Sequence, residues 1–242
     1  MLQVKLTDNY AGVTISGDFN DLNYLYNSIN CFLMKKPSSG GEDSMQLHSY
    51  GFLYDLRHAY QGDREYTLVD NNLSESKRKW FGIKKSAVTE NNVYYSFNYI
   101  LPELILDAIL INSFVNNMSK KDIDKYTAEL NFVNYFYSLV INSLHEFLSN
   151  TKINEIKKGL HNTIISPKTF IPQWYEDIAI DYMKMTKERR KKEFMSIVDK
   201  IYNYYNYGSY SMMKKALNKY CKENNCSLYD VELKDYPEEV IW

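Results

Sequence analysis

Hydrophobic and polar positions follow two different spacings along this chain. Residues 2–6 and 13–16 alternate as β-strands do and flank turn-forming residues at 8–12, which predicts an N-terminal hairpin. Apolar residues then recur every three or four positions over residues 22–33, so a first helix is expected to end near Lys35. The chain therefore opens with a hairpin and an amphipathic helix.

The next segments add a helix and two more strands. Apolar residues at 52–60 form one stripe of a helix, Gly62 stands where a left-handed residue often ends a helix, and residues 64–69 alternate as a strand. A polar loop is expected at 71–89 and a strand at 93–98. Four strands joined by hairpin-like connections lack the regular alternation of strand and helix that a parallel sheet requires, so an antiparallel sheet is predicted.

The second half of the chain has a helical pattern almost throughout. A helix that is apolar nearly all round begins at Pro102 and is expected in the centre of the fold. The strongest repeat follows over residues 123–147, with apolar side chains at alternating steps of three and four. A coiled-coil dimer and internal helix packing both fit this repeat, and the extra apolar residues Phe132, Phe136 and Leu139 favour packing.

Further helices are predicted at residues 153–161, at 173–185 with an extension through 205, and at 211–223. The acidic end of the chain is expected to be a tail, or a latch that docks Trp242. The predicted fold class is α+β, with a small antiparallel sheet and two helices in residues 1–100 and a mostly helical part in 101–242. The two parts are expected to share one core and form one compact domain.

Composition excludes several classes of protein. The 242 residues are 45% hydrophobic, which is enough to bury a full core without disulfides or metal. A net charge of -1 argues against a dedicated nucleic-acid or membrane-surface protein. Three cysteines form no disulfide framework, and the N-terminus lacks a signal peptide, so a cytoplasmic protein is expected. The longest apolar run, at 100–115, is shorter than the about 20 residues that cross a bilayer.

The end of the second predicted helix carries the only cluster of polar residues that suggests chemistry. The catalytic candidates are Arg57, His58 and Arg64, and the binding candidates are Tyr54, His58, Gln61 and Asp63. The structural alternative, which is favoured, is a solvated face with a hydrogen bond from His58 to Asp55 or from Arg57 to Asp63. No metal-ligand spacing or glycine fingerprint is present, so neither a metal nor a cofactor is expected.

Two features invite a nucleic-acid interpretation. Arg57 and His58 partly resemble the Arg and His of metal-independent ribonucleases of the HEPN class, but neighbouring helical residues point about 100° apart and would not converge on one phosphate. The basic residues at 184–192 precede several tyrosines at 202–210, which could together contact phosphates and stack on bases. A solvated basic face is the favoured interpretation, because Glu188 and nearby acids offset the charge.

Three segments resemble the DUF6904 family of bacterial proteins, a domain of unknown function. The resemblance rests on residues 9–18 with Leu22 and Leu25, on residues 56–64, and on residues 92–103. It implies a soluble, intracellular bacterial protein and supplies no activity, cofactor or substrate.

The leading functional expectation is a non-catalytic regulatory or protein-interaction protein of the bacterial cytoplasm. The alternative is an RNA-binding protein or metal-independent ribonuclease that uses the Arg57–His58 region. An unidentified protein partner and a homodimer are both compatible with the pattern, nucleic acid is disfavoured, and no membrane association is expected. Whether the protein is an enzyme stays open at this point, as does the role of the loop expected at residues 37–44.

Overall fold

The computed structural model describes residues 1–242 except 35–43, 119–123, 125, 163–170, 229–230 and 232–235. The loop expected at residues 37–44 therefore lies outside the described residues up to position 43, and Ser44 already begins a helix.

Four strands form one antiparallel sheet, as the sequence predicted, and their order is β1-β2-β4-β3. Their bounds are Gln3–Leu6 for β1, Gly12–Gly17 for β2, Glu65–Asp70 for β3 and Asn91–Ile100 for β4. Gly12 faces the backbone of β4 so closely that a Cβ would lie 2.0 Å from the carbonyl oxygen of Tyr99. Only glycine permits this approach between the two central strands.

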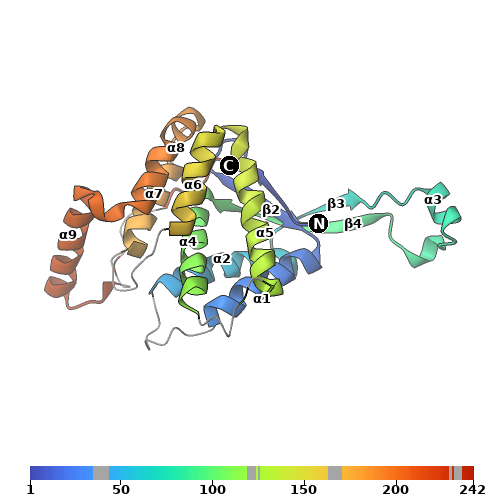
Figure 1. Cartoon of the computed structure of the whole chain (residues 1–242), viewed down its shortest axis with the longest axis horizontal. Helices are drawn as coiled ribbons and strands as arrows, with labels where there is room; N and C mark the ends of the chain where they lie inside the picture. Colours follow the sequence, from blue (N-terminus) through green and yellow to red (C-terminus); the bar gives the residue numbers. More distant parts are fainter. Residues whose placement is uncertain (35–43, 119–123, 125, 163–170, 229–230, 232–235) are drawn as a thin grey trace.

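Helices pack around the part of the sheet that lies away from the projecting ribbon of β3 and β4 (Figure 1). The α-helices are α1 Phe19–Met34, α2 Ser44–Gln61, α3 Glu75–Trp80, α4 Leu101–Asn117, α5 Ala128–Ser143, α6 Asn150–Asn162, α7 Ile171–Met183, α8 Lys187–Tyr202 and α9 Gly208–Asn224. Short 3-10 turns are η1 Lys85–Ala87, η2 Leu144–Glu146 and η3 Tyr204–Asn206. The α+β class is confirmed.

Helix α4 lies at the centre of the fold. It packs against α1, α2, α6, α7, α8 and the central strands, and its residues from Leu104 to Ile111 are almost all buried. Because every side of α4 meets another element, its apolar residues extend all round the helix rather than along one stripe. Buried residues from both halves of the chain, such as Phe52 and Phe194, belong to the same hydrophobic cluster as α4.

The long apolar repeat reflects internal packing. Val133 is 1% exposed, and Phe136 and Val140 are also buried, where α5 packs against α1 and β1. The predicted start of the helix was wrong: α5 begins at Ala128, and Tyr126 is exposed. Position 123 lies outside the described residues.

Two other predicted boundaries were also wrong. The helix expected from residue 173 with an extension through 205 is divided into α7 and α8, because the Thr186 hydroxyl caps α8 by accepting a hydrogen bond from the backbone of Arg189. The loop expected at 71–89 contains α3 and the turn η1. At the boundary between α7 and α8, the cap at Thr186 therefore starts a new helix although the apolar pattern is continuous.

The end of the chain is docked as a latch. The side chain of Asn9 donates a hydrogen bond of 2.7 Å to the carbonyl of Trp242, and Arg190 donates one of 2.9 Å to the carbonyl of Ile241. Arg190 is 1% exposed, so the favoured interpretation of residues 184–192 as a solvated basic face was wrong at this position. The guanidinium is a structural centre that joins α8, the first hairpin and the end of the chain.

Candidate functional site: a polar corner and a projecting arm

The predicted polar corner is formed where α2 ends and β3 begins. Gly62 has a φ of 88°, and the backbone N–H of Asp63 donates a hydrogen bond of 2.9 Å to the carbonyl of His58. This left-handed cap turns the chain back along the last turn of α2. Asp63 and Arg64 are thereby brought beside side chains of the preceding helix.

Two ion pairs form at this corner, with different partners from those predicted. His58 Nδ1 lies 2.9 Å from Asp63 Oδ2, and Arg64 donates a hydrogen bond of 2.6 Å to Asp55 Oδ1. The expected pairs of His58 with Asp55 and of Arg57 with Asp63 were therefore wrong. The turn at Gly62 decides which side chains pair, because it brings the Asp63 carboxylate to Nδ1 of His58.

The remaining corner residues surround this pair only in part. The rings of Tyr54 and His58 are 4.1 Å apart, and the guanidinium of Arg57 lies 5.7 Å from the centre of the Tyr54 ring. Gln61 is exposed. The structure thus brings Tyr54, His58 and Asp63 together, whereas Arg57 and Arg64 do not converge on one point. A phosphate would have to compete with Asp63 and Asp55 for the charged donors of this corner.

A second group of titratable residues is buried behind the corner, and sequence reasoning missed it. Tyr99 on β4 donates a hydrogen bond of 2.8 Å to Asp107 Oδ2 on α4, and Asp107 is completely buried. Burial raises the pKa of Asp107 to about 7, although the hydroxyl groups of Tyr99 and Ser49 oppose that rise. Its other oxygen, Oδ1, has no hydrogen-bond partner among the described residues.

Glu103 and His48 extend this buried group. Burial raises the pKa of Glu103 to about 7, and the neighbouring His48 partly offsets the rise. Burial likewise lowers the pKa of His48, whose Nε2 is enclosed. An acid in the middle of the apolar run at 100–115 was the signal that could have revealed the group. Because Asp107 is sealed from solvent, its carboxyl group cannot meet a substrate directly, whereas His48 and Glu103 are half-buried.

The most distinctive surface of the molecule is an arm that projects from the body (Figure 1). Strand β4 is longer than β2, and their pairing stops at Gly17 opposite Tyr95. Beyond that point β4 pairs only with β3, as far as Asn91 opposite Asp70. Residues 66–95, called the arm from here on, therefore form a two-stranded ribbon with α3 at its end.

One face of the ribbon is apolar. Tyr66 lies opposite Tyr95, and Leu68 lies opposite Val93, so the four side chains share a face. Tyr66, Leu68 and Val93 are exposed. A free two-stranded ribbon is marginally stable in water, so an exposed apolar face on it is a candidate contact surface.

The tip of the arm carries two neighbouring exposed aromatic side chains. Trp80 is 81% exposed and Phe81 is 58% exposed, and their ring centres are 4.6 Å apart. The Ser74 hydroxyl caps α3 by accepting a hydrogen bond from the backbone of Lys77, and none of the residues of α3 is buried. Local hydrogen bonds therefore hold the tip, and the body of the protein does not cover it.

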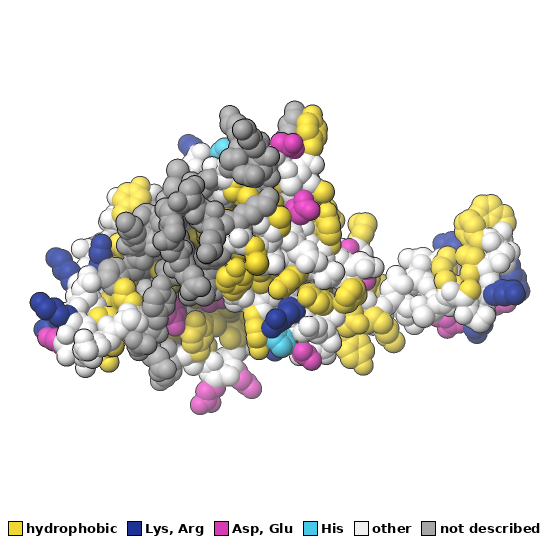
Figure 2. Space-filling model, turned by 90° about the horizontal axis from the view of Figure 1, so that it is seen from below, with side chains coloured by type: hydrophobic (Ala, Val, Ile, Leu, Met, Phe, Trp, Pro, Cys, Tyr) yellow, Lys and Arg dark blue, Asp and Glu magenta, His cyan; other side chains and the backbone are white. Residues whose placement is uncertain are grey.

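Basic residues surround this aromatic pair. Residues 71–90 contain five basic and two acidic residues, whereas the whole chain has a net charge of -1. Lys79 pairs with Glu75 at 2.8 Å, and Lys85 pairs with Glu90 at 3.4 Å, both on the surface. Figure 2 shows hydrophobic side chains at the end of the arm, flanked by basic ones. The tip is thus an apolar knob with an excess of positive charge.

The fold and these surfaces define an α+β protein with a four-stranded antiparallel sheet, a central helix and a projecting β-arm. The chain belongs to the DUF6904 family, a domain of unknown function, whose family model matches residues 2–242. No curated protein and no solved structure matches it.

Two searches of the described residues bear on the kind of site. None of the helices found there is long and apolar enough to cross a membrane. The same part of the chain contains no group of three or more His, Cys, Asp or Glu side chains that could hold a metal ion.

Proposed function

We propose that this protein is a non-catalytic interaction protein that binds a protein partner through the arm. The observation that carries the proposal is the exposure of Trp80 and Phe81 at the tip. Large aromatic side chains are the residues that most often dominate binding energy at protein interfaces, and they rarely stay exposed together without a partner. The arm also holds them away from the body, where a groove on another molecule can enclose them.

The charge of the tip specifies the chemistry of the partner. An excess of basic residues around an apolar knob complements an apolar groove with an acidic rim. Such rim charges mainly speed association and select the partner, while the buried rings supply most of the affinity. We therefore assign the arm to an acidic protein partner.

A second copy of this chain is a less suitable partner for the arm. Strand β3 is an edge strand with Glu65 at one end and Asp70 at the other. Antiparallel pairing of two β3 strands about their centre would place Glu65 opposite Asp70, and like charges directly opposite each other destabilise a sheet. This placement of charges supports a different protein as the partner over a homodimer formed by the pairing of two β3 strands.

The RNA alternative at Arg57 and His58 has less support. His58 and Arg64 are each paired with a carboxylate, and Arg57 packs near the Tyr54 ring. Basic residues with an exposed tryptophan could instead bind a nucleic acid at the arm. RNA is therefore included as an outcome of the experiment below.

We place this function in the bacterial cytoplasm. The placement is supported by Cys31 and Cys226, which are free thiols in the structure.

Photo-crosslinking from the tip tests the proposal. A photoreactive phenylalanine analogue at position 81 is expected to form an adduct with one protein that carries an acidic surface. The matched control is the same analogue at position 220, because Tyr220 is also exposed but lies on α9, at the other end of the molecule from the arm (Figure 1). This control position is expected to give no such adduct.

The purified partner then allows a quantitative test. Trp80→Ala and Phe81→Ala are each expected to weaken binding at least about tenfold, as the loss of an interface hot spot does. Neither change should alter the free energy of unfolding by more than about 0.5 kcal/mol, because both side chains are exposed. An adduct with a second copy or with RNA, or affinity that both variants retain, would reject the proposal.

A further inference from the structure

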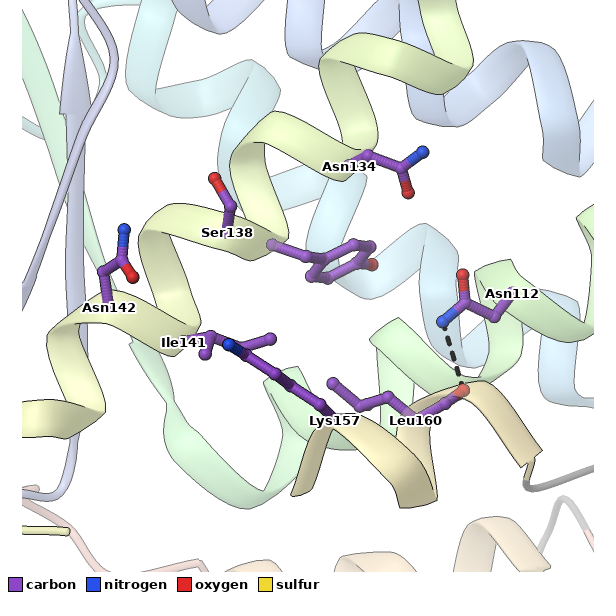
Figure 3. Close-up of a pocket in the computed structure, with 8 residues that line it drawn as sticks. Asn112, Asn134, Ser138, Ile141, Asn142, Lys157 and Leu160 are labelled. Atoms are coloured by element: carbon purple, nitrogen blue, oxygen red, sulfur yellow. Dashed lines mark hydrogen bonds between the residues drawn. The ribbon is translucent and has the colours of Figure 1, made fainter. Parts of the chain in front are cut away.

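A pocket lies between α4, α5 and α6 (Figure 3). Its cavity volume is about 260 Å³, and it is lined by Asn112, Asn134, Tyr137, Ser138, Ile141, Asn142, Lys157 and Leu160. The volume corresponds to that of about nine water molecules in the liquid. It lies just below the range of about 300–1,000 Å³ that is typical of sites for drug-sized ligands, so a small molecule fits it.

The polar lining consists of hydrogen-bonding groups and one cation. Three asparagine amides and the Ser138 hydroxyl are neutral, Lys157 is positively charged, and none of the eight lining residues is acidic. Figure 3 shows Lys157 reaching from α6 toward Ile141 on α5, with Asn112 facing the same region from α4. A negative charge placed in the pocket would meet an ammonium group without a carboxylate beside it.

Asn112 is already oriented by the protein. Its amide nitrogen donates a hydrogen bond of 3.2 Å to the carbonyl of Leu160. This contact ties α4 to the end of α6 and fixes which side of the amide is the oxygen. The amide oxygen can then accept a hydrogen bond from a ligand.

Tyr137 lines the pocket with its ring and not with its hydroxyl. The side chain is 7% exposed, and its hydroxyl is buried without a hydrogen-bond partner among the described residues. Burial raises the pKa of Tyr137, and the nearby Asp107 adds to that rise. The hydroxyl therefore lies on the side of the buried acid, and the ring forms part of the wall that a ligand would contact.

We propose that this pocket binds a small organic anion, with its carboxylate or phosphate group at Lys157 and a further polar group at the Asn112 amide oxygen. The apolar side chains of Ile141 and Leu160 would contact the carbon skeleton. The site is separate from the arm, and its ligand is not the protein partner proposed above.

Isothermal titration calorimetry with the full chain at low salt tests the proposal and separates the two kinds of anion. The probes are inorganic phosphate, glycerol 3-phosphate and malate. Saturable binding of one organic probe with a stoichiometry of one is expected, and inorganic phosphate is expected to bind more weakly because it lacks a second polar group for Asn112. Lys157→Gln should weaken binding at least about tenfold, since it removes a charge-assisted hydrogen bond.

The neighbouring lysine provides a matched control. Lys158 follows Lys157 on α6, is exposed and does not line the pocket, so Lys158→Gln should leave the affinity unchanged.

Three results would overturn the proposal. One is that none of the three probes binds at millimolar concentration. Another is that the two lysine variants lose the same affinity, which would indicate diffuse electrostatic attraction. The last is that Lys157→Gln, shown to be folded by circular dichroism, binds the probe as tightly as the unaltered chain.

Discussion

Arg190 on α8 and Ile241 at the end of the chain are joined by a hydrogen bond of 2.9 Å from the guanidinium to the backbone carbonyl. The same guanidinium donates to the carbonyls of Tyr182, Met183 and Asn9. One buried side chain therefore holds together α7, α8, the first hairpin and the final residues. Among the described residues no carboxylate forms an ion pair with it, and four backbone carbonyls accept its hydrogen bonds.

The first prediction concerns this centre. Arg190→Ala should lower the free energy of unfolding by about 3–5 kcal/mol, because four backbone carbonyls, two of them in buried hydrogen bonds, would lose their donor. The control is Arg189→Ala, which removes only a surface ion pair with Glu193 and should cost less than about 1 kcal/mol. Urea denaturation of both variants measures the difference. Equal losses would show that the buried contacts contribute little.

The second prediction concerns the pH dependence of stability. The folded protein holds the pKa values of Asp107 and Glu103 at about 7, above their ordinary values of 3.8 and 4.5. Their stabilising contribution is therefore complete at acidic pH and is lost as the pH rises toward 7. His48 has the opposite sign, because its lowered pKa removes stability as the pH falls below 6.5. The effect of the two carboxyl groups on the pH dependence of stability is larger than the opposite effect of the one histidine.

Asp107→Asn isolates one of these contributions. Between about pH 5 and 7, each carboxyl group should change the free energy of unfolding by about -1.4 kcal/mol per pH unit, and the variant should lack one such slope. Asp63→Asn is the control, since Asp63 is exposed and its loss should leave the slope unchanged. Denaturant titrations across this pH range provide the measurement. Parallel pH profiles for the unaltered chain and Asp107→Asn would contradict the buried-acid interpretation.

The third prediction compares two glycines around the polar corner. Gly62 has a φ of 88°, so Gly62→Ala should destabilise the protein by about 1 kcal/mol. Gly51 lies within α2, where an added Cβ would meet no atom within 4 Å, so Gly51→Ala should stabilise it by about 0.5–1 kcal/mol. Thermal melts of the two variants should therefore shift in opposite directions. Shifts of the same sign would refute the assignment of the cap.

The fourth prediction tests the packing of α5. Val133→Asp should unfold the chain, because it buries an unpaired carboxylate against α1 and β1. Asn134→Asp, at the next and exposed position of the same helix, should remain folded. Circular dichroism and size-exclusion chromatography distinguish the outcomes. A folded Val133→Asp monomer would show that this face forms a dimer interface instead.

Local patterns predicted most elements because their causes are local. Alternation marked the strands, and spacings of three and four marked the helices, including the central helix that begins beside Pro102. The predicted boundaries were wrong where a single contact decides where a helix begins or ends. The Thr186 cap that separates α7 from α8 is an example, since it interrupts a continuous apolar pattern.

The polar corner was predicted only in part. Its residues were identified because they are close together in sequence, and Gly62 was recognised as the end of the helix. The ion pairs were wrong because they depend on how far the chain turns after Gly62, which the residue types do not specify.

The sequence by itself determined the α+β class, the antiparallel sheet and the helix that fills the core, because hydrophobic spacing reflects which side of each element is buried. The tertiary structure alone decided three features. It placed Asp107 beside Tyr99, it brought Asn112, Tyr137 and Lys157 around one pocket, and it left Trp80 exposed on an arm. Each depends on which elements become neighbours and where their pairing stops, and such long-range contacts are not encoded in the spacing of residues along the chain.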